Sequence, residues 1–128
     1  MNVLIVESRA ELGALWKRHL ERHGTIVTLV HSQDDAIERL GVDSFNIIIL
    51  DLVLEGGSAL AVADFASFRH PETRVIFVTN TSFFSDGSIF QHCANACAFL
   101  PSATAPADLA AMVEHYATPP ESRRRNTN

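Results

Sequence analysis

Polar side chains follow several apolar runs of this chain, at positions where they could do chemistry together. The residues at or just after the five runs are Glu7 and Ser8, His31, Asp51, Thr79 and Ser102. Carboxylate and hydroxyl oxygens are suited to a metal ion or to a polyanion such as a phosphoryl group. Polar residues also cap helices and start turns, so each one taken alone has an ordinary structural role. They indicate a site only if the fold brings them together.

Five apolar blocks rich in β-branched residues predict strands. These blocks are Val3 to Val6, Ile26 to Val30, Ile47 to Leu50, Val75 to Thr79, and Cys97 to Leu100. Apolar runs without polar alternation are typical of strands that helices cover on both faces. The sheet is therefore expected to be parallel.

Segments with helical periodicity separate these strands. Ser8 and Glu11 have the spacing of a capping box for a first helix, which Gly24 would end. Ser32 is the expected cap of a second helix, which Gly41 would end. The other helices are expected from about Ser58 to Arg69, from about Phe84 to Ala96, and from Pro106 onward.

A strand and a helix thus alternate five times, which predicts an α/β fold with a doubly wound sheet and right-handed crossovers. In such sheets ligands bind at the carboxyl ends of the strands, beside the point where the strand order reverses. Glu7, Asp51 and Thr79 lie at or just after the carboxyl ends of predicted strands. We therefore expect their side chains to line one pocket.

Three stretches of the chain resemble the response-regulator receiver family of two-component signalling. They are Phe45 to Leu52, Val75 to Thr79, and Ala98 to Leu100, and the resemblance extends over residues 2 to 117. It implies a flavodoxin-like parallel sheet of order 2-1-3-4-5 with five helices. Residues 1–117 would form this domain, and the polar segment 118–128 would be a disordered tail.

The resemblance also implies roles for individual residues. Asp51 would accept a phosphoryl group from a histidine phosphodonor, with Mg²⁺ held by Glu7, Asp51 and the backbone carbonyl of Val53. Thr79 would donate its hydroxyl to a phosphoryl oxygen. Phe99 would be the aromatic side chain whose rotamer follows the movement of Thr79.

Two positions depart from the family pattern. Ser8 stands where the family has a second acidic residue that binds Mg²⁺, and Ser102 stands where it has a lysine. The expected consequence is weak or absent Mg²⁺ binding and weak or atypical phosphorylation of Asp51. Glu7 and Asp51 alone would leave the pocket with a formal charge of −2.

The expected function is that of a stand-alone receiver, not an enzyme beyond its own phosphoryl transfer and dephosphorylation. Its partners would be a histidine kinase or histidine phosphotransferase and a downstream protein, with a homodimer through helix 4, strand 5 and helix 5. One alternative is a pseudo-receiver that signals through protein contacts without phosphorylation. Another is an unrelated flavodoxin-like binding protein or small enzyme, for which Gly56 and Gly57 would form a phosphate-binding turn.

Composition limits the remaining possibilities. The net charge is −5, and the single basic cluster, Arg123 to Arg125, lies in the polar tail, so no affinity for nucleic acid is expected. No apolar run approaches the roughly 20 residues that span a bilayer. A cytoplasmic location without membrane attachment is therefore expected.

Overall fold

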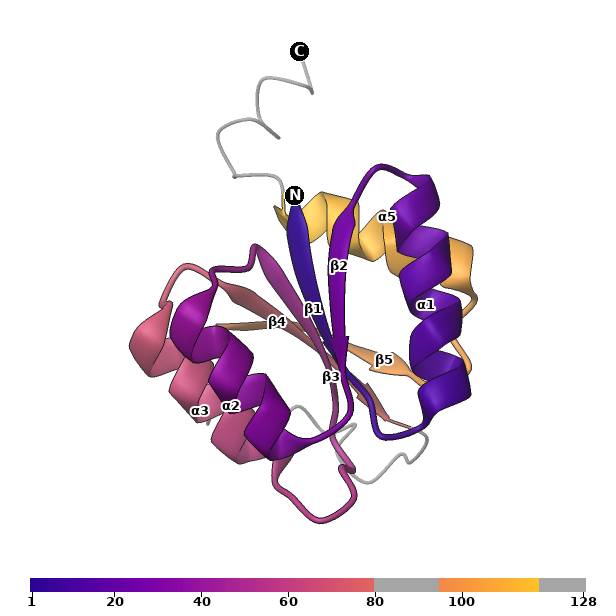
Figure 1. Cartoon of the computed structure of the whole chain (residues 1–128). Coiled ribbons are helices and arrows are strands. Elements are labelled where there is room, and N and C mark those ends of the chain that lie inside the picture. Colours follow the sequence, from indigo (N-terminus) through magenta and orange to yellow (C-terminus); the bar gives the residue numbers. More distant parts are fainter. Residues whose placement is uncertain (80–94, 118–128) are drawn as a thin grey trace.

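The computed structural model describes residues 1–79 and 95–117, which form one parallel sheet flanked by helices (Figure 1). Its strands are β1 (Asn2–Val6), β2 (Ile26–Val30), β3 (Ile47–Asp51), β4 (Arg74–Thr79) and β5 (Ala96–Pro101). Its helices are α1 (Ala10–Arg22), α2 (Gln33–Val42), α3 (Ala59–Arg69) and α5 (Pro106–Ala117). The strand order is β2-β1-β3-β4-β5, so the predicted fold class and topology are confirmed.

Helices cover both faces of the sheet. Figure 1 shows α2 and α3 on one face and α1 and α5 on the other. Successive residues of β1 alternate between the two cores: Leu4 packs in the core beneath α2 and α3, whereas Ile5 packs in the core beneath α1 and α5. This alternation explains why the strands carry continuous apolar runs, since helices cover both faces of the sheet.

The caps of α2 and α3 are the ones that the sequence predicts. The hydroxyl of Ser32 accepts a hydrogen bond from the Asp35 amide at 3.2 Å, and that of Ser58 accepts one from the Ala61 amide at 3.2 Å. Each satisfies one of the amides that a helix leaves unpaired in its first turn.

The predicted capping box at the start of α1 is wrong. The helix begins at Ala10, its cap residue is Arg9, and the Arg9 side chain makes no capping hydrogen bond. Ser8 lies one residue too early, and its hydroxyl bonds with other segments of the chain instead. Gly24 follows α1 with a φ of 82°, a conformation that favours glycine and agrees with the predicted helix end.

Two helix ends differ from the predicted ones. Helix α2 continues one residue past Gly41, to Val42. The predicted fourth helix falls mainly in 84–94, outside the described residues, and its predicted last residue, Ala96, begins β5 instead. The predicted tail, 118–128, also lies outside the described residues.

Within the described ranges, no helix has the length and apolar character needed to cross a membrane.

Candidate functional site

The sheet brings the predicted polar residues to one edge. Asp51 and Thr79 are the last residues of β3 and β4, and Glu7 follows β1 directly. Backbone hydrogen bonds join the neighbouring strand ends: the Leu52 amide donates to the Val78 carbonyl at 2.9 Å, and the Ser102 amide donates to the Thr79 carbonyl at 2.7 Å. The four predicted residues here, Glu7, Asp51, Thr79 and Ser102, are all buried.

Arg9, which is not among the predicted residues, contacts three of these four side chains. The guanidinium of Arg9 places Nε and Nη2 each 2.8 Å from Oε1 of Glu7. Its Nη2 also lies 3.2 Å from Oδ2 of Asp51 and 3.1 Å from the hydroxyl of Ser102. Arg9 therefore links the carboxyl ends of β1, β3 and β5 through one cation.

The local backbone explains how Arg9 reaches this position. It is the residue before α1, with φ −83° and ψ 104°, so it is extended and not part of the helix. Its long side chain leaves about half of its surface, 46%, exposed while the guanidinium lies against buried carboxylates. Long cationic side chains often divide in this way between an apolar stem and a charged head.

Sequence reasoning missed Arg9, although a signal for it was present. Ser102 stands where a lysine is expected, so two buried acidic groups would lack a cation, and Arg9 is the basic residue nearest to Glu7 in the chain. The expected formal charge of −2 is also wrong, because Arg9 brings the sum to −1 when Glu7 and Asp51 are both ionised. The sequence could suggest this residue but could not place its guanidinium.

Glu7 has an unusual electrostatic environment. Its side chain is completely buried, and among the described residues its Oε2 has no hydrogen-bond partner. Burial raises the pKa of Glu7 from 4.5 to about 8; the neighbouring Asp51 carboxylate adds to this rise, and Arg9 opposes it. At neutral pH Glu7 therefore tends to hold a proton.

Both carboxylate oxygens of Asp51 receive hydrogen bonds. Oδ1 accepts from the Val53 amide at 2.9 Å, and Oδ2 accepts from Arg9. The Val53 bond fixes the turn directly after β3, in the way that Asp side chains commonly do. The carboxylate is thus held in one orientation at the edge of the sheet.

Ser8 holds the loop that follows β3. Its hydroxyl donates to the carbonyl of His31 at 3.2 Å and accepts from the Glu55 amide at 3.0 Å. Gln33 holds the same loop further on, because its Oε1 accepts from the Ser58 amide at 2.7 Å. The loop is anchored to the ends of β1 and β2.

The two glycines of this loop serve the turn. Gly56 has a φ of 67°, which favours glycine, and a Cβ on Gly57 would lie 2.7 Å from the Cβ of Gln33. The need for glycine at both positions is thus explained by backbone shape and close packing. Neither observation supports the phosphate-binding turn of the third alternative.

The residues of this pocket do not fit the magnesium site that the family resemblance implies. Mg²⁺ requires a near-octahedral set of oxygen ligands, commonly including carboxylates. The carboxylates of Glu7 and Asp51 both already accept hydrogen bonds from Arg9. The hydroxyl of Ser8 is bonded to the His31 carbonyl and the Glu55 amide. Within the two described ranges, no group of three or more His, Cys, Asp or Glu residues could hold a metal ion.

Two further predicted residues lie near this edge. Phe99 is in β5 and is half-buried against the core beneath α2 and α3. Val53 lies in the loop after Asp51, with 57% of its surface exposed. Their predicted roles, as rotamer switch and as carbonyl ligand, remain predictions.

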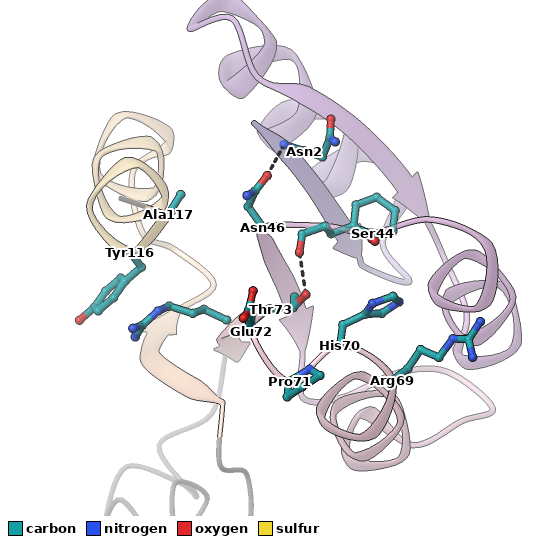
Figure 2. A pocket seen from close by; sticks show the side chains of 12 residues that line it. Asn2, Ser44, Asn46, Arg69, His70, Pro71, Glu72, Thr73, Tyr116 and Ala117 are labelled. Carbon is teal, nitrogen blue, oxygen red and sulfur yellow. Dashed lines mark hydrogen bonds between the residues drawn. The ribbon is translucent and has the colours of Figure 1, made fainter. Parts of the chain in front are cut away.

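A groove lies at the opposite edge of the sheet. This groove of about 810 Å³ is lined by residues at the amino ends of the strands, together with the end of α3 and the end of α5 (Figure 2). Its polar groups hold the chain together: the Asn46 side chain accepts from the Asn2 amide at 2.8 Å, and the Thr73 hydroxyl donates to the Phe45 carbonyl at 2.6 Å. The cluster around Glu7, Arg9 and Asp51, and not this groove, is therefore the candidate site.

Known proteins share both the sequence pattern and the fold. A family model described as the response regulator receiver domain matches residues 3–114. The comparison with curated proteins found no match. Among solved structures, a CheY-like receiver domain protein from Methanospirillum hungatei JF-1 is 20% identical, with a TM-score of 0.83 over 91% of this chain and 92% of that one.

Two more structures extend the comparison. The receiver domain of a LuxO repressor protein from Vibrio parahaemolyticus is 26% identical, with a TM-score of 0.81 over 91% of this chain and 88% of that one. The response regulator TrrA from Thermotoga maritima, solved in complex with Mg²⁺ and BeF, is 18% identical, with a TM-score of 0.79 over 90% of this chain and 97% of that one. Since the family model covers most of the sequence, the chain belongs to the response regulator receiver domain family.

Proposed function

We propose that this chain acts as a receiver in two-component signal transduction, in which Asp51 accepts a phosphoryl group weakly or atypically. The observation that carries the proposal is the bridge from Arg9 to Asp51 and Ser102. It brings a positive charge to the strand end that lacks the family's lysine. An acceptor carboxylate and a cation for developing negative charge are thus both available.

The proposed reaction is a direct transfer. An oxygen of the Asp51 carboxylate attacks the phosphorus of an N-phosphorylated histidine, the P–N bond breaks, and its electron pair leaves with the nitrogen, which takes a proton. Arg9 would face the oxygens of the transferred group, and Thr79 would donate its hydroxyl to one of them. The reaction would be slow, because Arg9 must first give up its contact with Asp51 Oδ2.

The partners follow from this role. A histidine kinase or histidine phosphotransferase would supply the phosphoryl group in the cytoplasm, and a downstream protein would read the result. Catalysis would be limited to the protein's own phosphorylation and dephosphorylation. A homodimer through the fourth helix, β5 and α5 stays a proposal, since residues 84–94 lie outside the described part of the chain.

Phosphorylation can be tested by incubating the protein with a small-molecule N–P phosphodonor and recording its intact mass. Slow addition of one phosphoryl group is expected, and the Asp51→Asn variant should remain unmodified. The incubation is carried out both with Mg²⁺ and with a chelator, so that a metal requirement does not hide the reaction. An unmodified protein under both conditions would refute phosphoryl acceptance.

The second candidate function is a pseudo-receiver that signals through protein contacts without phosphorylation. One observation favours it: both oxygens of Asp51 already accept hydrogen bonds, from Val53 and from Arg9. A carboxylate held in this way is a poorer nucleophile, because each bond must be weakened before attack. The absence of any phosphoryl adduct, together with an unchanged fold in Asp51→Asn, would favour this candidate.

A further inference from the structure

We propose that Arg9 is the built-in cation of the Asp51 pocket and takes the place of a divalent metal ion there. The wild-type pocket would then have no appreciable affinity for Mg²⁺ or Mn²⁺, and the removal of Arg9 would create a binding site for them. The inference rests on the proposed function in that Asp51 is the centre of the pocket, but its test requires no phosphorylation.

The position of the guanidinium carries the argument. It lies 2.8 Å from a carboxylate oxygen of Glu7 and 3.2 Å from one of Asp51, and both side chains are buried. A divalent ion bound by these two carboxylates would lie next to the positive charge of Arg9. The guanidinium, which already contacts an oxygen of each carboxylate, would repel that ion strongly, because the surrounding protein screens charge less than water does.

Two other potential ligand atoms already make hydrogen bonds. The Ser8 hydroxyl is used by the His31 carbonyl and the Glu55 amide, so it holds a loop in place. The second oxygen of Asp51 accepts the bond from Val53. An incoming ion would have to displace Arg9 and also compete with a bond that shapes the turn.

Arg9 connects strand ends that a bound metal ion could otherwise connect. Through Glu7, Asp51 and Ser102 it joins the ends of β1, β3 and β5. A covalently attached cation cannot diffuse away, so this connection is independent of the concentration of free metal. The state of the pocket would therefore be the same at low and high Mg²⁺.

The test uses Mn²⁺ as a paramagnetic probe of the full chain. Backbone NMR spectra are recorded during titration of the wild type and of Arg9→Met, which keeps an unbranched apolar side chain without the charge. We expect Arg9→Met to bind Mn²⁺ at least about tenfold more tightly than the wild type, with broadening of the amides near Asp51, and Mg²⁺ should reverse the broadening.

Two control variants make the result specific. Arg22→Ala removes a positive charge from the exposed end of α1 and should bind Mn²⁺ as weakly as the wild type. Glu7→Gln combined with Arg9→Met should lose the gained affinity, which would place the new site in this pocket. Circular dichroism establishes that each variant is folded. Arg9→Lys keeps the positive charge, so it should bind Mn²⁺ as weakly as the wild type.

Two results would overturn the proposal. One is wild-type binding of Mn²⁺ in the Asp51 pocket as tight as that of Arg9→Met, and the other is a folded Arg9→Met protein with no gain in affinity. Neither result depends on whether a phosphodonor modifies Asp51. The failure of this proposal is therefore distinguishable from the failure of the proposed function.

Discussion

The Nη2 atom of Arg9 lies 3.2 Å from Oδ2 of Asp51, although 42 positions separate the two residues in the chain. Asp51 is 4% exposed, and the nearby Glu7 is completely buried. Without Arg9 two acidic groups would face each other with no positive partner. We therefore expect this pair to stabilise the carboxyl edge of the sheet.

The coupling between Arg9 and Asp51 should be measurable. Arg9→Ala should lower the free energy of unfolding by about 1 to 2 kcal/mol, a value below that of a fully buried pair because Arg9 is half-exposed. The loss should be smaller in an Asp51→Asn background, where the charge of Asp51 no longer has to be neutralised. Urea unfolding of the four proteins gives the coupling energy. Equal losses in both backgrounds would mean that Arg9 acts through other contacts.

Glu7 should make the protein less stable as the pH rises. Its pKa is raised from 4.5 to about 8 by burial, so its contribution is fully present below about pH 4.5 and declines as the pH approaches 8. Across this window the unfolded chain releases the proton that the folded protein retains. At about 1.4 kcal/mol for each pKa unit, the loss amounts to several kcal/mol at most.

The Glu7→Gln variant isolates this effect. Its amide carbonyl can still accept from Arg9, but the side chain does not titrate. Unfolding free energies of the two proteins should therefore diverge between pH 4.5 and 8, with the wild type falling relative to the variant. Curves that stay parallel would show that the proton on Glu7 does not distinguish the folded from the unfolded state.

Ser8 should be important for the loop after β3 and not for metal binding. Ser8→Ala removes hydrogen bonds with His31 and Glu55 and should cost about 1 kcal/mol. Hydrogen exchange of the Glu55 amide should become faster. Ser44→Ala, at an exposed position in another loop, is the matched control and should change little. Unaltered exchange at Glu55 would contradict the anchoring role.

Two glycines in helices should respond oppositely to replacement by alanine. A Cβ on Gly41 would meet nothing within 4 Å, so Gly41→Ala should stabilise the protein by about 0.5 kcal/mol through helix propensity. A Cβ on Gly13 would lie 2.8 Å from Cδ1 of Leu29, so Gly13→Ala should destabilise it by about 1 kcal/mol. Thermal unfolding of both variants gives the order, and a stabilised Gly13→Ala would show that Leu29 moves without cost.

The sequence by itself determined the fold and the main polar positions of the pocket. Continuous apolar runs such as Ile47 to Leu50 occur where a strand is covered on both faces, and the carboxyl ends of parallel strands must meet at one edge. Glu7, Asp51 and Thr79 could therefore be assigned to one site from their places after the strands. The serines that cap α2 and α3 were also predictable, because a helix cap depends only on neighbours in the chain.

Only the tertiary structure decided what Arg9 and Ser8 do. The spacing of Ser8 and Glu11 is that of a helix cap, yet the hydroxyl of Ser8 bonds with a carbonyl 23 positions away and an amide 47 positions away. The contacts of Arg9 with Asp51 and Ser102 likewise span distant parts of the chain. Such contacts depend on where a long side chain points once the strands are assembled. Local sequence patterns do not contain that information.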